Sequence, residues 1–211
     1  MQIKVCGLTN NRNIREIALL GPDYMGFVFH KNSPRDVSES VGELQLSTIP
    51  PGVKKVAVLV DQPIEKARDI IIKYRFDAVQ LHGDEDPDYC KELMTLCEVI
   101  KAFRINDSLP EELNQYEKKC HLFLFDAKGK HQGGNGIKFN HEILKGYNLK
   151  TPFILSGGIG DDDIPYLLSI DMEGLSGVDL NSRFEISPGY KSLSSLKVFI
   201  NKLRSDERVN K

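Results

Sequence analysis

Cys6 is the residue of this chain whose type and position are best suited to chemistry. The strand-like stretch Ile3-Lys4-Val5 leads into it, and Gly7, Thr9 and Asn10 follow. This order predicts a short strand that ends at a thiol, then a glycine turn and a helix with Thr9 or Asn10 as its N-cap. A thiol beside a helix N-terminus is a candidate nucleophile or base. Because most free cysteines are buried packing residues, the pattern by itself leaves both roles open.

Other polar side chains also follow apolar runs. Asp126 ends the run 122–126, where it is a candidate general acid or a turn aspartate. Arg35 follows Ser33 and Pro34; its planar fork suits a bidentate contact with a carboxylate, and the alternative is a surface arginine. We interpret His82, just after the run 78–81, as a turn or packing histidine rather than a catalytic residue.

A phosphate site is predicted from two further segments. Gly157 and Gly158 follow an apolar run, and glycine lets backbone N–H groups approach an anion closely. Asp179, Asn181 and Ser182 end the next apolar run, so all five are candidate substrate-binding residues. A tight turn would need the same two glycines. The glycine pair alone therefore does not distinguish a phosphate site from a turn.

The elements that must position these residues alternate regularly. Eight apolar runs read as strands, and segments of helical period lie between most of them, which favours βαβ units. The expected strands are 3–6, 24–29, 56–60, 78–81, 99–103, 122–126, 153–156 and 177–180; the clearest helices are 10–20, 64–74 and 186–203. The chain is thus expected to be one (β/α)₈ barrel domain, residues 1–211, with chemistry at the C-terminal ends of its strands. The expected fifth and sixth helices are the weakest, because 107–118 is polar and 140–146 is short, so an open doubly wound sheet with fewer strands is the alternative.

Composition narrows the class of partner. The net charge is −2, which gives no electrostatic footprint for nucleic acid or an anionic membrane. The apolar runs are strand-sized, far too short to span a bilayer. Four cysteines without zinc-type spacing favour a reducing, cytoplasmic setting. A strand predicted from the first residues leads us to expect no targeting peptide.

Six stretches, in order along the chain, resemble the phosphoribosylanthranilate isomerase family of tryptophan biosynthesis. They are residues 4–9, 26–35, 79–83, 124–136, 155–158 and 178–189. The resemblance implies a (β/α)₈ barrel that needs no metal or organic cofactor. It also implies an Amadori rearrangement of N-(5-phosphoribosyl)anthranilate to 1-(2-carboxyphenylamino)-1-deoxyribulose 5-phosphate. In this resemblance Cys6 is the general base, Asp126 the general acid and Arg35 the clamp on the anthranilate carboxylate.

The chain departs from the family pattern at two places. Residues 133–136 read Gly-Gly-Asn-Gly where the family usually has Gly-Gly-Thr-Gly, and Arg183 replaces a small residue in the loop after the last strand. Arg183 either adds charge to the phosphate site or marks a differently built loop. Another phosphate-binding barrel enzyme (a pentose-phosphate epimerase or an indole-forming synthase) and a non-catalytic metabolite-binding barrel remain alternatives. The expected partner is a small phosphorylated substrate, and the expected assembly is a monomer or homodimer.

Overall fold

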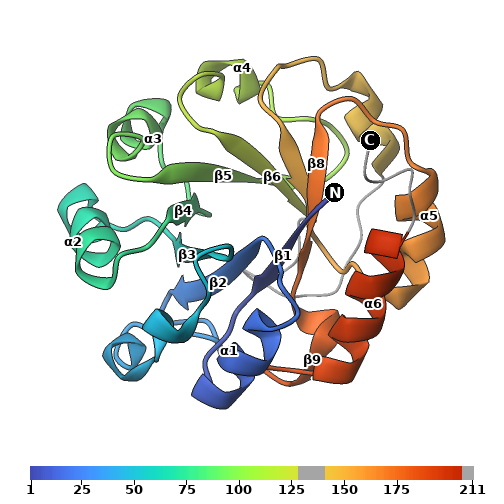
Figure 1. Ribbon diagram of the computed structural model, residues 1–211. Coiled ribbons are helices and arrows are strands. Elements are labelled where there is room, and N and C mark those ends of the chain that lie inside the picture. The colour runs from blue at the N-terminus through green and yellow to red at the C-terminus, as the bar shows by residue number, and fades with distance from the viewer. Residues whose placement is uncertain (128–140, 206–211) are drawn as a thin grey trace.

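The first strand of the protein pairs with the eighth, which closes a barrel. The computed structural model describes residues 1–127 and 141–205 (Figure 1). Within that part of the chain the parallel strands follow one another in sequence order around the barrel, and β8 pairs with β1. They are β1 (Gln2–Cys6), β2 (Tyr24–Phe29), β3 (Lys54–Leu59), β4 (Ala78–Leu81), β5 (Glu98–Ile105), β6 (Leu122–Ala127), β7 (Phe153–Leu155) and β8 (Leu175–Leu180). The predicted (β/α)₈ barrel is confirmed, and the open sheet is excluded.

Helices surround the barrel in Figure 1. They are α1 (Asn11–Ala18), α2 (Ile64–Tyr74), α3 (Pro87–Leu93), α4 (Leu113–Tyr116), α5 (Ile164–Ser169) and α6 (Leu193–Ser205), with short 3₁₀ helices at η1 (Val41–Glu43), η2 (Leu46–Thr48), η3 (His141–Gly146), η4 (Asp161–Asp163) and η5 (Ser182–Phe184). The predicted N-cap is confirmed, since the Asn10 side chain accepts a hydrogen bond from the backbone N–H of Asn13. Among the described residues, no helix combines the length and the apolar character needed to cross a bilayer.

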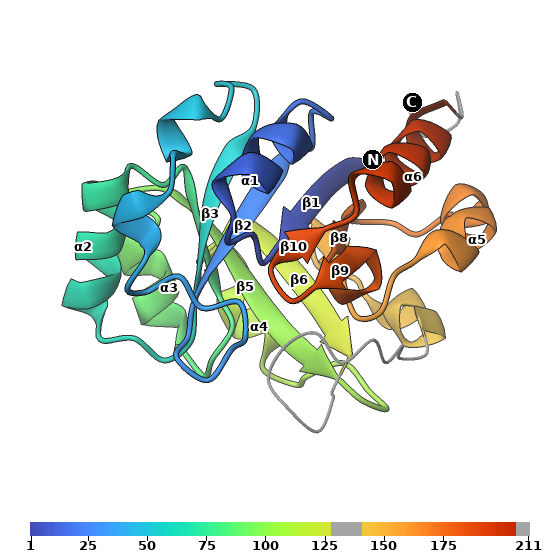
Figure 2. The ribbon, with the colours of Figure 1, turned by 90° about the horizontal axis from the view of Figure 1, so that it is seen from below.

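Two predicted helices are wrong in extent. The last one begins at Leu193 rather than residue 186, because β9 (Glu185–Ser187) and β10 (Tyr190–Lys191) form a small hairpin first (Figure 2). Gly189 turns this hairpin at φ +84°, a backbone conformation outside the helix. The polar segment 107–118 is helical only in α4. The short segment predicted over 140–146 is the 3₁₀ helix η3; Asn140 itself lies outside the described residues.

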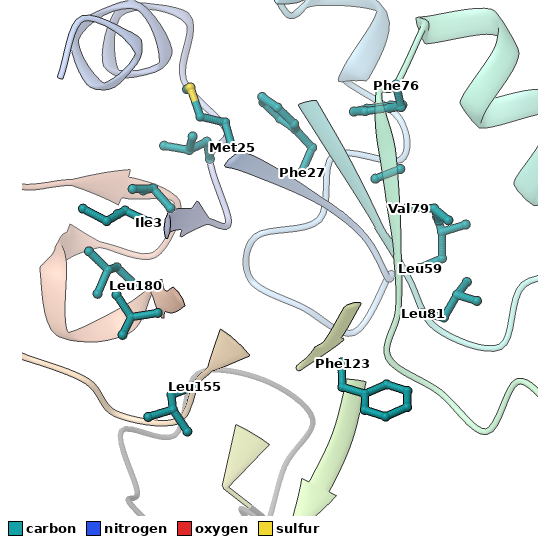
Figure 3. Packing of buried hydrophobic residues seen from close by; sticks show 14 of the residues in the cluster. Ile3, Met25, Phe27, Leu59, Phe76, Val79, Leu81, Phe123, Leu155 and Leu180 are labelled. Atoms are coloured by element: carbon teal, nitrogen blue, oxygen red, sulfur yellow. The ribbon is translucent and has the colours of Figure 1, made fainter. Parts of the chain in front are cut away.

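Alternation along the strands separates two apolar layers. On β1, Ile3 and Val5 face outward and pack in the layer under the helices, which also contains Phe27 and Phe76 (Figure 3). The inward positions form a second cluster that includes Cys6. Because successive side chains alternate, every second residue of each strand points into the barrel, and its C-terminal mouth is lined by the last inward residue of each strand.

Candidate active site

The thiol of Cys6 sits at the inner end of β1. Its residue is only 4% exposed, and it pairs in register with Gly26 of β2. A Cβ atom placed on Gly26 would lie 2.7 Å from the Cys6 Sγ, so the glycine on the neighbouring strand makes room for the sulfur. The predicted thiol at a strand end is therefore correctly placed inside the barrel mouth.

A buried ion pair lies next to this thiol. Lys4 precedes Cys6 by two residues and shares its inward face; its Nζ is 2.9 Å from the Asp179 Oδ1 on β8, and the two side chains are 0% and 5% exposed. Ser156 donates a hydrogen bond of 3.1 Å to the other carboxylate oxygen. Asp179, predicted as a substrate ligand, thus has both oxygens engaged by protein groups. Lys4 was missed by the sequence analysis, although its i, i+2 spacing to Cys6 was the available signal.

Burial governs the ionisation of Cys6. Desolvation raises the pKa of its thiol, and the nearby Lys4 and Lys191 cations oppose that rise without cancelling it. A nearby cation would favour the thiolate. The structure has the cations, but the missing water outweighs them. Cys6 is consequently a thiol at neutral pH and a strong base once deprotonated.

Asp126 lies on the other side of the mouth, at the end of β6. Its Oδ2 is 3.4 Å from the His82 Nε2, and the two side chains are 16% and 17% exposed. The Gln80 amide nitrogen lies 3.0 Å from the His82 Nδ1. With that amide donating, the neutral ring carries its proton on Nε2 and directs it at Asp126. His82, interpreted above as a turn or packing residue, therefore belongs to the site.

Arg104 is a second site residue that the sequence analysis missed. It lies on β5 in register with Asp126 on β6, and its Nη2 donates a 2.9 Å hydrogen bond to the carbonyl oxygen of His82. It follows Ile100 and Ala102, which face inward, at the same period of two. That period was the signal that placed its guanidinium at the barrel mouth.

Arg35 packs against Gly7, the glycine turn that follows Cys6. A Cβ atom on Gly7, which has φ +78°, would lie 2.5 Å from the Arg35 Cδ, so only glycine lets the arginine pack against the residue after Cys6. The Arg35 Nε and Nη2 donate hydrogen bonds of 2.8 and 2.5 Å to the two carboxylate oxygens of Glu185. Its side chain is 9% exposed, which excludes the alternative of a surface arginine.

The loops after β7 and β8 lie side by side, and the phosphate site predicted there stays a prediction. Gly157 and Gly158 have φ +87° and +69°, and in the described part of the chain their N–H groups donate no hydrogen bond. The Arg183 guanidinium packs over Gly160, where an added Cβ would lie 2.9 Å from the Arg183 Nε, and it pairs with Asp162 at 3.2 Å. Arg183 therefore joins the two loops.

The remaining predicted residues take different positions in this region. Asn181 accepts a hydrogen bond of 2.7 Å from the Lys191 Nζ, so its side chain supports the loop. Ser182 begins η5 directly after β8. The stretch 133–136 lies outside the described residues. In residues 1–127 and 141–205 no group of three or more His, Cys, Asp or Glu side chains could hold a metal ion; a metal-free, cofactor-free reaction stays a prediction.

Comparison with known proteins decides the family. The sequence profile described as N-(5'phosphoribosyl)anthranilate (PRA) isomerase matches residues 3–202. The chain belongs to this family. It is accordingly an enzyme, an isomerase of tryptophan biosynthesis. It is 39% identical over 206 residues to the N-(5'-phosphoribosyl)anthranilate isomerase of Parabacteroides distasonis, with 96% of this chain and 93% of that protein covered. It is 40% identical over 208 residues to the enzyme of Petrotoga mobilis, with 97% and 98% covered.

Solved structures agree with the family assignment. The isomerase of Thermus thermophilus superposes with a TM-score of 0.81 at 28% identity over 97% of this chain and 99% of that chain. An isomerase in complex with reduced 1-(o-carboxyphenylamino)-1-deoxyribulose 5-phosphate superposes with a TM-score of 0.80 at 27% identity over 98% and 100%. A 3-hexulose-6-phosphate synthase of Salmonella typhimurium shares the fold, with a TM-score of 0.67 at 13% identity over 96% of this chain and 100% of that chain.

Proposed function

We propose that the protein converts N-(5-phosphoribosyl)anthranilate into 1-(2-carboxyphenylamino)-1-deoxyribulose 5-phosphate, with Cys6 as general base and Asp126 as general acid. The observation that carries the proposal is the placement of these two groups. Cys6 ends β1 and Asp126 lies near the end of β6, both on inward positions at the C-terminal mouth, with two strands between them on the shorter way around the barrel. A substrate in the mouth would thus have the thiol and the carboxyl on different sides.

The reaction needs one proton delivered and one removed. Asp126 gives a proton to the ring oxygen of the sugar as the C1–O bond breaks, which leaves an iminium between C1 and the anthranilate nitrogen. Cys6, as thiolate, takes the proton from C2, and the resulting enaminol tautomerises to the ketose. Each proton transfer by a positioned side chain is worth roughly two to four orders of magnitude in rate.

The other site residues supply binding and orientation. Arg35 lies over Gly7, beside Cys6, and we assign it to the anthranilate carboxylate. The free N–H groups of Gly157 and Gly158, with Ser182 from the facing loop, are assigned to the phosphate. The 3.4 Å contact of His82 helps to orient the Asp126 carboxyl.

A single assay tests this function. Phosphoribosylanthranilate is generated in solution from anthranilate and a phosphoribosyl donor, and its anthranilate-type fluorescence is followed after the protein is added. A protein-dependent loss of fluorescence, with the ketose phosphate as product, is the expected result. Absence of turnover on this substrate, beside turnover on a pentose phosphate or on the carboxyphenylamino-deoxyribulose phosphate itself, would assign the barrel to an epimerase or an indole-forming synthase instead.

A further inference from the structure

One buried carboxylate, Glu185, binds two cations beside the proposed substrate site. Its Oε1 accepts hydrogen bonds from the Arg35 Nε at 2.8 Å, the Lys191 Nζ at 2.8 Å and the backbone N–H of Gly189 at 3.1 Å. Its Oε2 accepts from the Arg35 Nη2 at 2.5 Å. The three side chains are between 0% and 9% exposed. A charged cluster this buried and this fully bonded holds its members in one arrangement.

Glu185 binds only one edge of the Arg35 guanidinium. The carboxylate occupies the edge formed by Nε and Nη2, which is one of the two edges that can form a bidentate contact. The Nη1 atom has no hydrogen-bond partner among residues 1–127 and 141–205. The second edge, formed by Nη1 and Nη2, is therefore free to bind another carboxylate.

Charge makes this free edge attractive to an anion. Two cations against one carboxylate leave a net charge of +1 in the cluster formed by Arg35, Glu185 and Lys191. Burial alone would raise the pKa of Glu185, but the hydrogen bonds from Arg35 and the charge of Lys191 outweigh it and lower the pKa, so the carboxylate is ionised at neutral pH. Burial lowers the pKa of Lys191, and the charge of Glu185 opposes that fall without cancelling it, so the excess positive charge depends on Lys191 keeping its proton.

The chain anchors this cluster from two sides. Lys191 lies on β10, and its Nζ also donates to the Asn181 Oδ1 at 2.7 Å, while its backbone exchanges hydrogen bonds with the Asn13 side chain. Gly189 accepts from the backbone N–H and the hydroxyl of Thr9. The hairpin, which begins with Glu185, is thus tied by hydrogen bonds to the segment that follows Cys6.

We propose that Glu185 is a positioning residue that aims the free Nη1–Nη2 edge of Arg35 at the carboxylate of the aromatic substrate, with Lys191 as the counter-cation that holds Glu185 in place. The inference rests on the proposed function of the site. It adds a specificity element: the protein selects an aromatic amine that carries a carboxylate over one without it.

The test separates geometry from charge. In the double variant Glu185→Gln/Lys191→Met the cluster keeps its net charge of +1, because one anion and one cation are removed together, but the carboxylate fork on Arg35 is lost. We expect the dissociation constant of free anthranilate, followed by its fluorescence, to rise about ten- to a hundredfold, the effect of losing a charge-assisted hydrogen bond. Inhibition by inorganic phosphate should change less than anthranilate binding, because Lys191 reaches the phosphate loop only through the Asn181 side chain.

The control removes another Lys–Glu ion pair, more exposed than Glu185 and Lys191, at the other end of the barrel. Lys54 and Glu98 form a 2.5 Å ion pair at the start of β3 and β5. The variant Lys54→Met/Glu98→Gln should bind anthranilate as the wild type does. If the Glu185 variant does not fold, Glu185→Asp withdraws the carboxylate while it keeps the charge, and it should weaken anthranilate in the same way.

The outcomes are distinguishable. Unchanged or tighter anthranilate binding in a folded Glu185 variant would show that Glu185 only neutralises Arg35 and would overturn the inference, while turnover by the wild type would leave the proposed function standing. Anthranilate binding by the wild type without turnover would reject the proposed function and leave the carboxylate site in place. A wild-type protein that does not bind anthranilate would reject both.

Discussion

The two sides of the barrel mouth differ in how tightly their polar groups are held. The Cys6 wall, formed by β8, β1 and β2, buries its charges: the thiol residue is 4% exposed, and Lys4 and Asp179 are paired at 2.9 Å. On the Asp126 wall, formed by β4 to β6, Asp126 and His82 are 16% and 17% exposed and meet at 3.4 Å. The Cys6 wall is thus buried and held by a short ion pair, while the Asp126 wall is more exposed and has a longer contact.

This difference bears on the two proton transfers proposed above. On the Cys6 wall desolvation changes the pKa of the thiol before any substrate arrives. On the Asp126 wall water still reaches the carboxyl, so a substrate that fills the mouth would remove that water and alter the environment of the acid only on binding. Variants on the two walls should therefore differ in their effects on stability as well as on rate.

The largest effect is expected from removing the thiol. Cys6→Ser keeps the size of the side chain but replaces the thiol with a hydroxyl, which is a far weaker acid, so the reactive anion is lost. We expect kcat to fall by roughly two to four orders of magnitude with little change in substrate affinity. Cys97→Ser, a thiol outside the site, is the control. A Cys6→Ser variant that kept more than a tenth of the wild-type turnover would remove Cys6 from the mechanism.

On the Asp126 wall the corresponding change is Asp126→Asn. It keeps the shape of the side chain but removes the transferable proton, and the rate should fall by roughly two to four orders of magnitude. Because this wall is loosely bonded, the melting temperature should stay as in the wild type. Asp84→Asn, an exposed carboxyl two residues after His82, should be fully active. A melting temperature that fell together with activity would instead support a structural role for Asp126.

The third comparison sets the two arginines of the site against each other. Arg35→Lys keeps the charge but loses the planar fork, and it should weaken anthranilate about ten- to a hundredfold without affecting phosphate inhibition. Arg183→Gly removes an exposed guanidinium paired with Asp162, and it should weaken phosphate inhibition or change nothing. Competition by each ligand against substrate measures both. If Arg35→Lys weakened phosphate and not anthranilate, its assignment to the carboxylate would be wrong.

The pH dependence of the rate tests the ionisation of Cys6 on the Cys6 wall. Burial raises the pKa of Cys6, so the thiolate is a minor species near pH 7 and its population grows as the pH rises. We expect kcat/KM to fall on both sides of an optimum, because one group must be deprotonated and the other protonated. A profile that falls on neither side, under conditions where chemistry limits the rate, would contradict the assignment of the pair.

The smallest expected effect is on the free energy of unfolding, and it tests whether burial alone raises the pKa of a thiol outside the site. Burial raises the pKa of the Cys90 and Cys97 thiols to about 12, although neither lies in the site. In the unfolded chain a thiol ionises near pH 8.5, so the unfolded state releases protons that the folded state keeps. The free energy of unfolding should therefore fall between about pH 8.5 and 12, by up to about 1.4 kcal/mol per pH unit for each thiol.

Urea unfolding at pH 7.5 and 9.5 under reducing conditions measures this slope. Cys97→Ala should show a shallower decline than the wild type, because one of the thiols with a raised pKa is gone. Equal slopes for the two proteins would mean that Cys97 does not keep its proton in the folded state, and burial would then be too weak a cause for the shift assigned to Cys6.

The repeating pattern of the chain was enough to predict the barrel. Period-two apolar runs and period-3.6 segments depend on local backbone geometry, so the eight strands and α2 could be recognised from the residues alone. The same local logic placed Cys6 and Asp126 at strand ends. It failed over 186–192, where the predicted helix ran through Pro188 and Gly189, a pair that marks a turn, and the chain forms a hairpin there with Gly189 close to Thr9.

The tertiary structure alone decided which charges meet. Lys4 binds Asp179, which lies 175 positions away, and Arg35 binds Glu185, which lies 150 positions away. These partners depend on the closure of β8 against β1 and on the register between them. A sequence pattern tells which face of a strand a residue occupies, but not which residue of a distant strand will stand opposite. For the same reason the raised pKa of Cys6 could not be predicted, since the residue type supplies the thiol while the packed barrel removes its water.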